Sequence, residues 1–295
     1  EKLNILHVHY AIPHASAAVN AKQILATYGI HIPIVTTLHG TDITLLGKDK
    51  SFKPVIEYAI NQSDAVTAVS QNLKEETLLN FKIKDEIKVI PNFIDMSLYK
   101  QECNQVLRDK FAKKEEAILV HISNFRKVKR VQDVVKIFEK VNKQVPSKLF
   151  MIGDGPERLK AEQLCRKLGI AKHVRFLGKL KVIEKFLCIA DVFVLPSKTE
   201  SFGLVALEAM ASKVAVISTN SGGLPEVNID GETGYLSDVG DVNKMANDTI
   251  DLLKDADKLN QFKNNALAHA KTFDLPNILP QYEPIYQELS CEMNK

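Results

Sequence analysis

Short runs of consecutive apolar residues alternate with amphipathic stretches along the chain. In the first third, strand-like runs lie at 4–10, 33–39, 65–70 and 88–93, and helical patterns lie between them near 15–28, 53–62 and 72–81. Apolar residues in these runs are adjacent rather than alternating with polar ones, as at Ile34 and Val35, which is typical of strands buried on both faces. The pattern therefore predicts repeated β-α-β units in a parallel sheet covered by helices.

The rhythm breaks between residues 95 and 113, a polar segment without a strand-like run. A second series of strand-like runs follows at 117–123, 147–153, 174–178, 191–196, 214–219 and 234–236. Helical patterns such as 157–168 and 202–212 separate them. We therefore expect an α/β protein with a Rossmann-like domain over 1–95, a second Rossmann-like domain over 96–274, and a terminal helix within 275–295.

The two series differ in completeness. The second has six strands, as expected of a whole doubly wound unit, whereas the first has about four and opens directly with a strand. A nucleotide-binding fold of this kind usually has a Gly-rich turn after its first strand. No such turn occurs before residue 40. We therefore expect the first domain to lack its N-terminal strands.

Composition narrows the class of protein. Hydrophobic residues make up 45% of the 295 and charged residues 25%, which is ordinary for a globular protein, and a net charge of +3 gives no argument for a nucleic-acid partner. No apolar run approaches the ~20 residues of a bilayer-spanning helix, and the start does not resemble a signal peptide. The cysteines show no C-x-x-C spacing, which favours free thiols in a reducing cytoplasm. They are Cys103, Cys165, Cys188 and Cys291. We expect a cytoplasmic protein without stable membrane association; the sequence leaves a homo-oligomer open.

The strongest candidate site follows the strand at 191–196. A loop between the carboxyl end of a parallel strand and the amino end of a helix is where open sheets bind ligands, and helix-end N–H groups favour phosphate. Gly203 in this loop would let a phosphate approach the backbone closely. Glu208 stands in a helix that is apolar nearly all round, where a carboxylate without a partner is costly. A ribose diol would supply two donors; the alternative is a surface glutamate on an apolar helix.

The pattern E-S-F-G-x-x-x-x-E-A-M-A, from Glu200 to Ala211, resembles the signature of retaining glycosyltransferases of the GT-B type, in which two Rossmann-like domains face a cleft. The resemblance implies that Glu208 holds the ribose hydroxyls of a nucleotide sugar and Glu200 holds the transferred sugar. It also implies that the terminal helix crosses back onto the first domain. The loop and helix residues that the resemblance assigns to the donor are Ser201, Phe202, Gly203 and Leu204.

A basic segment ends the first strand of the second series. Four cations between residues 126 and 130, at a strand end that opens a helix, suit a pyrophosphate; a solvated helix start or a nucleic-acid patch is the alternative. The resemblance matches Lys129 to a lysine that neutralises the leaving diphosphate. Asn124 stands where the family has an arginine, so Arg126 is the candidate substitute. Ser123 and Asn124 are expected to line the donor site.

Two glycine-containing segments follow other strands. Residues 151–158 begin like a G-x-G-x-x-G dinucleotide motif, but Arg158 replaces the third glycine, so we expect no dinucleotide site. The resemblance implies instead that Gly153, with Phe176 and Leu177, frames the uracil; a tight turn is the alternative for Gly153. The loop 220–226 is expected to border the sugar and phosphates, or to be a plain connection.

Histidines mark the first domain. His7 and His9 project from one face of a strand, so a metal-dependent hydrolase must be considered, with His14 or His39 as a third ligand. Core or surface histidines are the alternative. The resemblance favours His39 as a residue that faces the sugar.

Acidic metal-binding motifs are poorly represented. D-x-D occurs only at 255–257, between two helical patterns and away from any strand end. Since cations near residue 129 would take the place of a metal ion, we expect no metal and no other cofactor.

Three segments, 7–15, 36–44 and 123–134, narrow the resemblance to a bacterial branch of the family. That branch transfers N-acetylglucosamine from UDP-N-acetylglucosamine (UDP-GlcNAc) to L-malate in the first step of bacillithiol biosynthesis. Residues 1–100 contain no arginine that could bind malate carboxylates, which leaves Tyr10 and Thr41 as acceptor-binding candidates. Two alternatives stay open: a sister transferase with a lipid or polysaccharide acceptor, and a non-catalytic sugar-nucleotide-binding protein.

Overall fold

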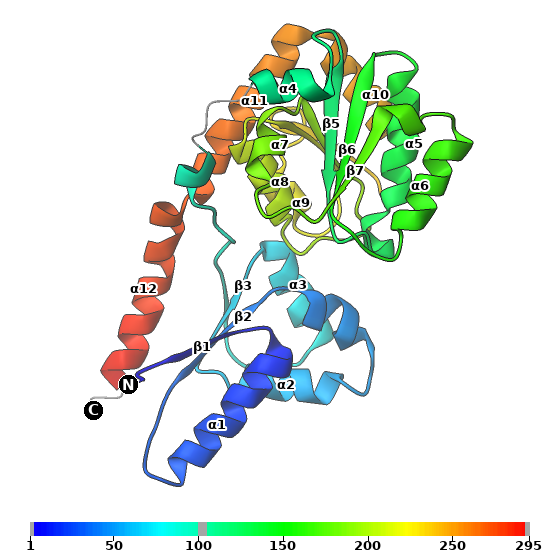
Figure 1. The fold of residues 1–295 in the computed structure, drawn as a ribbon. Coiled ribbons are helices and arrows are strands. Elements are labelled where there is room, and N and C mark those ends of the chain that lie inside the picture. Colours follow the sequence, from blue (N-terminus) through cyan, green and yellow to red (C-terminus); the bar gives the residue numbers. More distant parts are fainter. Residues whose placement is uncertain (1–2, 100–104, 293–295) are drawn as a thin grey trace. The chain divides into compact units, whose positions relative to one another are not determined.

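The structure, a computed structural model, describes residues 3–99 and 105–292 and divides into two compact units (Figure 1). Unit 1 comprises Glu1–Phe93 and Leu275–Lys295, and unit 2 comprises Ile94–Asp274. Each unit is built on an open, fully parallel sheet with helices on its faces. The prediction of two Rossmann-like α/β parts is confirmed, and the ten expected strand-like runs overlap β1 to β10.

Unit 1 contains a four-stranded sheet in the order β1-β2-β3-β4. Its strands are β1 (Leu6–His9), β2 (Ile34–Leu38), β3 (Ala65–Ala68) and β4 (Ile87–Val89). Every residue of β2 is buried, because neighbouring side chains point to opposite, covered faces. Ile34 packs against Ala18 and Val19 of α1 (Ser16–Ala26), whereas Val35 packs against the terminal helix α12 (Leu275–Glu292).

The carboxyl ends of β1 and β2 lead into tight helical turns rather than glycine-rich loops. These turns are η1 (Ala11–Ala15), η2 (Thr41–Leu45) and η3 (Leu46–Lys48). Two longer helices follow, α2 (Lys53–Asn61) and α3 (Gln71–Asn80). The Ser70 hydroxyl accepts a hydrogen bond from Leu73 N at 3.1 Å and so caps α3. The candidate residues of unit 1 therefore lie on short turns anchored by buried strands.

Unit 2 contains a six-stranded sheet in the order β10-β9-β8-β5-β6-β7. Its strands are β5 (Ala117–Ile122), β6 (Ser147–Ile152), β7 (Val174–Gly178), β8 (Val192–Leu195), β9 (Ala215–Thr219) and β10 (Gly234–Ser237). The first strand, β5, lies between β6 and β8, so the winding direction reverses there. Open α/β sheets bind ligands outside the strand ends at this switch point.

Helices cover both faces of the unit-2 sheet (Figure 1). One face carries α5 (Val131–Asn142), α6 (Arg158–Lys167) and α10 (Val242–Lys254). The other carries α7 (Glu184–Cys188), α8 (Leu204–Ala211) and α11 (Ala256–Ala270). The short helix α9 (Leu224–Val227) follows β9.

The polar segment 95–113 contains helices that its sequence did not indicate. They are η4 (Met96–Tyr99) and α4 (Gln105–Phe111). A tertiary contact holds α4, because Arg108 donates to the Asp191 carboxylate at 2.9 Å just before β8. Seven residues are too few for a convincing helical period, and the ion pair that orders them spans 83 positions.

The expectation of four free thiols is wrong for Cys188, which forms a disulfide bond. Cys165 and Cys291 are free, and Cys103 lies outside the described residues. Within the described parts of the chain, no helix is both long and apolar enough to cross a bilayer.

Candidate active site

Three loops meet at the carboxyl edge of the unit-2 sheet, after β5, β8 and β9. Lys198 N, after β8, donates to Val128 O at 2.7 Å, which ties the second loop to the first. Gly223 N, after β9, donates to Glu200 O at 2.8 Å, which ties the third loop to the second. The backbone thus assembles the switch-point site from segments that are far apart in sequence.

Lys129 and Glu200 form the polar centre of this site. Lys129 Nζ donates to Glu200 Oε1 at 2.6 Å, and both side chains are largely buried, at 19% and 12% exposed. A salt bridge this sheltered from water is screened little and fixes both side chains. The sequence placed these residues at a diphosphate and a sugar, respectively, and the structure brings them into direct contact.

Glycine is required where the third loop presses on the second. Gly222 has φ = +66°, and a Cβ at this position would lie 1.9 Å from Glu200 O. Any other residue would push the Glu200 backbone away. The loop 220–223 is therefore a structural support for Glu200, and not only a plain connection.

Glu208 lies one turn into α8. Burial and the nearby Glu184 carboxylate raise the pKa of Glu208 to about 7. Glu184, at the start of α7, has a buried Oε2 without a hydrogen-bond partner in the described structure. Burial of the Tyr99 hydroxyl raises its pKa, and the charges of the same two glutamates raise it further. A ligand with two hydroxyl donors would relieve the charge repulsion here. Sequence reasoning missed Glu184, because nothing in its local pattern relates it to α8.

Ser123, a predicted donor-site residue, is hydrogen-bonded within the protein. His121 is fully buried, and its Nδ1 lies 2.8 Å from Val194 O. Because a carbonyl only accepts, Nδ1 carries the proton and Nε2 accepts from the Ser123 hydroxyl at 2.8 Å. Ser123 Oγ also accepts from Phe125 N at 3.3 Å. Ser123 therefore orders the loop after β5, together with His121, which was not among the predicted site residues.

The four cations of the basic segment are not equivalent. Lys129 contacts Glu200, but Arg126 and Asn124 are exposed. Arg130 binds Asp133 through its Nε at 2.6 Å, and Lys136 meets the same carboxylate at 3.1 Å. Of the basic segment, only Lys129 is shown in contact with the predicted sugar-binding glutamate.

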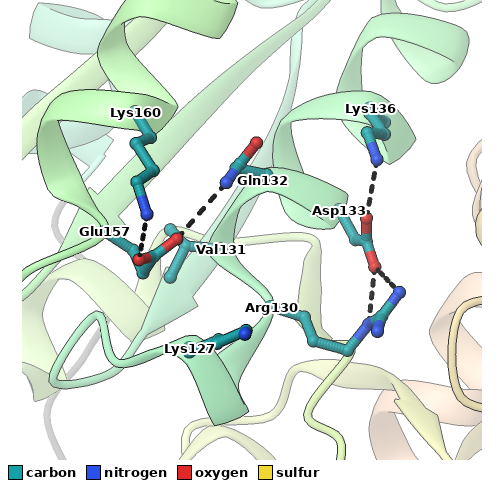
Figure 2. A pocket seen from close by; sticks show the side chains of 8 residues that line it. All are labelled: Lys127, Arg130, Val131, Gln132, Asp133, Lys136, Glu157 and Lys160. Atoms are coloured by element: carbon teal, nitrogen blue, oxygen red, sulfur yellow. Dashed lines mark hydrogen bonds and ion pairs between the residues drawn. The ribbon is translucent and has the colours of Figure 1, made fainter.

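Lys127 and Arg130 line a hollow of about 320 Å³. Figure 2 shows its lining side chains. Its carboxylates face its cations: Asp133 lies between Arg130 and Lys136, and Lys160 donates to Glu157 at 2.7 Å. These ion pairs offset only part of the positive charge, because four cations and two carboxylates line the hollow.

The remaining donor candidates lie on β7 and at the start of α8. Phe176 packs edge-on against the buried Phe125, so its ring supports the core as well as the strand end. Gly153, with φ = +120°, packs so closely on Ser123 O that a Cβ would lie 1.8 Å away. Leu177 is half-buried on β7. At the α8 end, Ser201 is half-buried, Phe202 and Gly203 are buried, and Leu204 is exposed.

Unit 1 carries a row of histidines along the ends of β1 and β2. His9 Nδ1 lies 2.8 Å from His39 Nε2, and the His7 and His9 rings stack at 4.9 Å. His7 is also hydrogen-bonded to Tyr286 of α12 at 2.7 Å. Burial, with the neighbouring histidines, lowers the pKa of His39 to about 4. His39 is therefore neutral at neutral pH and can exchange hydrogen bonds with sugar hydroxyls. Tyr10 lies beside it, with ring centroids 5.0 Å apart, and Thr41 is exposed nearby in sequence.

The metal-binding arrangement considered for His7 and His9 does not form. Within residues 3–99 and 105–292, no three His, Cys, Asp or Glu side chains converge as metal ligands. The Nε2 atom of His7 is hydrogen-bonded to Thr37 Oγ1 at 2.8 Å. Asp255 of the D-x-D sequence caps α11 by accepting from Lys258 N at 3.0 Å.

Comparison with known proteins covers both units. Residues 104–269 match the family model Glycosyl transferases group 1, and residues 1–98 match Glycosyltransferase Family 4. The chain is 47% identical over 291 residues to the N-acetyl-alpha-D-glucosaminyl L-malate synthase of Bacillus anthracis, covering 98% of this chain and 76% of that protein.

Solved structures share the fold. The Anabaena protein Alr3699/HepE in complex with UDP matches 97% of this chain and 79% of its own, with a TM-score of 0.86 at 23% identity. Sucrose-phosphate synthase from Thermosynechococcus elongatus matches 98% of this chain and 74% of its own, with a TM-score of 0.84 at 22% identity. The matches to the family models agree with the fold and with the arrangement at the switch point. The chain belongs to the group 1 glycosyl transferases and is a sugar-nucleotide-dependent glycosyltransferase of the GT-B fold.

Proposed function

We propose that this protein transfers N-acetylglucosamine from UDP-GlcNAc to the hydroxyl of L-malate with retention of configuration, the reaction that begins bacillithiol biosynthesis. The observation that carries the proposal is the 47% identity to the N-acetyl-alpha-D-glucosaminyl L-malate synthase of Bacillus anthracis across 98% of this chain. Because this identity extends over both units, it supports a common donor and a common acceptor.

In this proposal the donor binds at the switch point of unit 2. Glu208 accepts hydrogen bonds from the two ribose hydroxyls, a role that suits a buried carboxylate beside a second one, Glu184. Glu200 holds the sugar, and Lys129 stabilises the negative charge that develops on the departing diphosphate. Preorganised charge of this kind is commonly the largest single contribution to catalysis. Arg126 is proposed as an additional cation, since it is exposed and able to turn toward a ligand.

The transfer breaks the bond between the anomeric carbon and the diphosphate oxygen and forms one to the malate hydroxyl oxygen. The hydroxyl proton passes to the departing UDP. Retention through two displacements would need a carboxylate nucleophile at the anomeric carbon. Glu200 is ion-paired with Lys129, so we favour attack on the same face as the leaving group. His39, Tyr10 and Thr41 are the proposed sugar- and acceptor-facing residues of unit 1.

The proposal includes independence from metal ions, because Lys129 provides the positive charge that a bound metal would otherwise supply. The test incubates the protein with UDP-GlcNAc and L-malate in the presence of EDTA. Mass spectrometry follows glycosylated malate and UDP, and the anomeric proton coupling reports the configuration of the product. We expect α-linked product to form at the same rate with and without EDTA.

Two lysine variants make this test specific to the site. Lys129→Met removes the cation that contacts Glu200 and should lower kcat/KM by about 10²- to 10³-fold. Lys136→Met removes a cation that pairs with Asp133 in the separate hollow and should leave kcat/KM nearly unchanged. If UDP-GlcNAc binds but malate is not modified, the malate assignment is wrong and lipid or polysaccharide acceptors become the next to test. Loss of turnover with EDTA would refute metal independence.

A further inference from the structure

Tyr10 has a backbone conformation that a bulky residue rarely adopts. Its φ and ψ are 73° and 137°, in a region that strongly favours glycine. Such a conformation persists only where the surrounding structure enforces it. The strained backbone places the Tyr10 ring with its centroid 5.0 Å from that of His39 and 6.5 Å from that of His14.

Hydrogen bonds on both sides of this residue enforce the conformation. Tyr10 N donates to Thr37 O of β2 at 2.9 Å. The next N–H, of Ala11, donates to Asp42 Oδ2 at 2.5 Å. The first bond continues the β1–β2 pairing, whereas the acceptor of the second is a side chain 31 positions away. Asp42 is therefore the side chain that holds the backbone immediately after Tyr10.

Asp42 holds the loop after β2 at the same time. Its Oδ1 accepts from Gly40 N at 3.3 Å, and its carboxylate also interacts with the N–H groups of Asp42 itself and Ile43. Asp42 is 1% exposed, so solvent cannot replace these bonds. One carboxylate thus connects the loop that carries Tyr10 to the turn that carries Thr41.

We propose that Asp42 is a positioning residue for the acceptor: it locks the loops after β1 and β2 together, so that Tyr10 and Thr41 present one fixed binding geometry. The proposal rests on the glycosyltransferase function proposed above, in which these two residues face the acceptor. Asp42 itself is buried and does not contact substrate.

The test compares Asp42→Asn with Asp64→Asn in the complete protein. Asp64 is a matched control, because it also accepts from a backbone N–H, that of Ile34 at 2.7 Å, but at the amino ends of the strands. It is ion-paired with Lys22 at 2.6 Å and is distant in register from the candidate site. Asparagine preserves side-chain size but leaves one oxygen where the carboxylate offered two.

We expect D42N to raise the acceptor KM by about 10- to 100-fold, because a displacement of about 1 Å is enough to weaken binding on this scale. The KM for UDP-GlcNAc should stay within about threefold, since all the proposed donor residues except His39 lie in unit 2. Amide hydrogen exchange at Ala11 and Gly40 should accelerate in D42N only. D64N should change neither the acceptor KM nor exchange at these two amides.

The proposal is overturned if D42N leaves the acceptor KM and the two exchange rates unchanged, or if D64N raises the acceptor KM equally. If D42N does not fold, Asp42→Glu supplies the same readouts, because it keeps the charge but moves the oxygens by one methylene; unchanged acceptor KM and exchange in that variant would also overturn the proposal. A wild-type protein that modifies no malate would refute the proposed function instead. In that case exchange at Ala11 and Gly40 still decides whether Asp42 locks the loops.

Discussion

Single residues of one sequence motif have different surroundings in this protein. Lys129 and Arg126 are three positions apart in the same basic segment, and both were candidates for a diphosphate. Lys129 contacts Glu200 at 2.6 Å, whereas Arg126 is exposed. Spacing in the sequence predicted that cations gather at the end of β5. Which of them meets Glu200 depends on how the loop after β8 returns 71 positions later.

Glu208 gives a pH-dependent prediction at this scale. Its pKa is about 7 in the folded protein, against an ordinary value of 4.5, because of burial and the Glu184 charge. Between these values the folded state binds a proton that the unfolded state has lost, so this group stabilises the fold at low pH and the contribution is lost as pH rises through 7. We expect the deprotonation of Glu208 to lower the unfolding free energy by about 2–3 kcal/mol as the pH rises from 5 to 8.

Urea unfolding of the wild type and Glu208→Gln at both pH values checks this prediction. The neutral amide does not titrate, so the wild type should lose more unfolding free energy than the variant between pH 5 and pH 8. Equal losses in the two proteins would show that Glu208 does not carry the raised pKa.

At the scale of elements, α12 shows how a helix near the end of the chain joins the core of unit 1. The buried side of the helix packs on β2 and the segment after β4 through residues of both parts. They are Val35, Ile90, Ile278, Tyr282, Ile285 and Leu289. Its interior prolines, Pro280 and Pro284, lack the N–H of a regular helix, so packing rather than propensity must hold it.

Truncation of this buried side gives a second prediction. Ile285 is 2% exposed, so Ile285→Ala should lower the unfolding free energy of unit 1 by about 2–4 kcal/mol through lost burial and a residual cavity. Leu279 on the same helix is 44% exposed, and Leu279→Ala should change it by less than about 0.5 kcal/mol. Hydrogen exchange of the β2 amides, measured in both variants, separates the outcomes. Equal effects would mean that α12 does not support the unit-1 sheet through Ile285.

Elements differ in how far the sequence predicted them. The buried strands were recognisable because consecutive apolar residues are required on both faces of a covered parallel strand. The helix α4 was not recognisable, since none of its residues is buried and its order comes from the Arg108–Asp191 ion pair. Tight turns such as η1 and η2 were also missed, because their hydrogen bonds lack a hydrophobic period.

At the scale of the whole molecule, the division into two units predicts which unit a bound nucleotide stabilises. The proposed donor residues Lys129, Glu200 and Glu208 all belong to unit 2. UDP at 100 times its dissociation constant should therefore stabilise unit 2 by about 2.7 kcal/mol. Hydrogen exchange with and without UDP should show protection in the segments that follow β5 and β8. Protection confined to unit 1 would contradict the assignment of the donor site.

The sequence by itself determined the parallel α/β architecture, the two series of strands and the carboxyl edges at which polar loops gather. These features follow from local periodicity and from the E-S-F-G signature, which the chain carries regardless of its folding. Tertiary structure alone decided that Lys129 pairs with Glu200, that Glu184 lies beside Glu208, and that Asp42 joins the loops of Tyr10 and Thr41. Such contacts connect residues tens of positions apart, and their strength depends on burial, which only the packed protein provides.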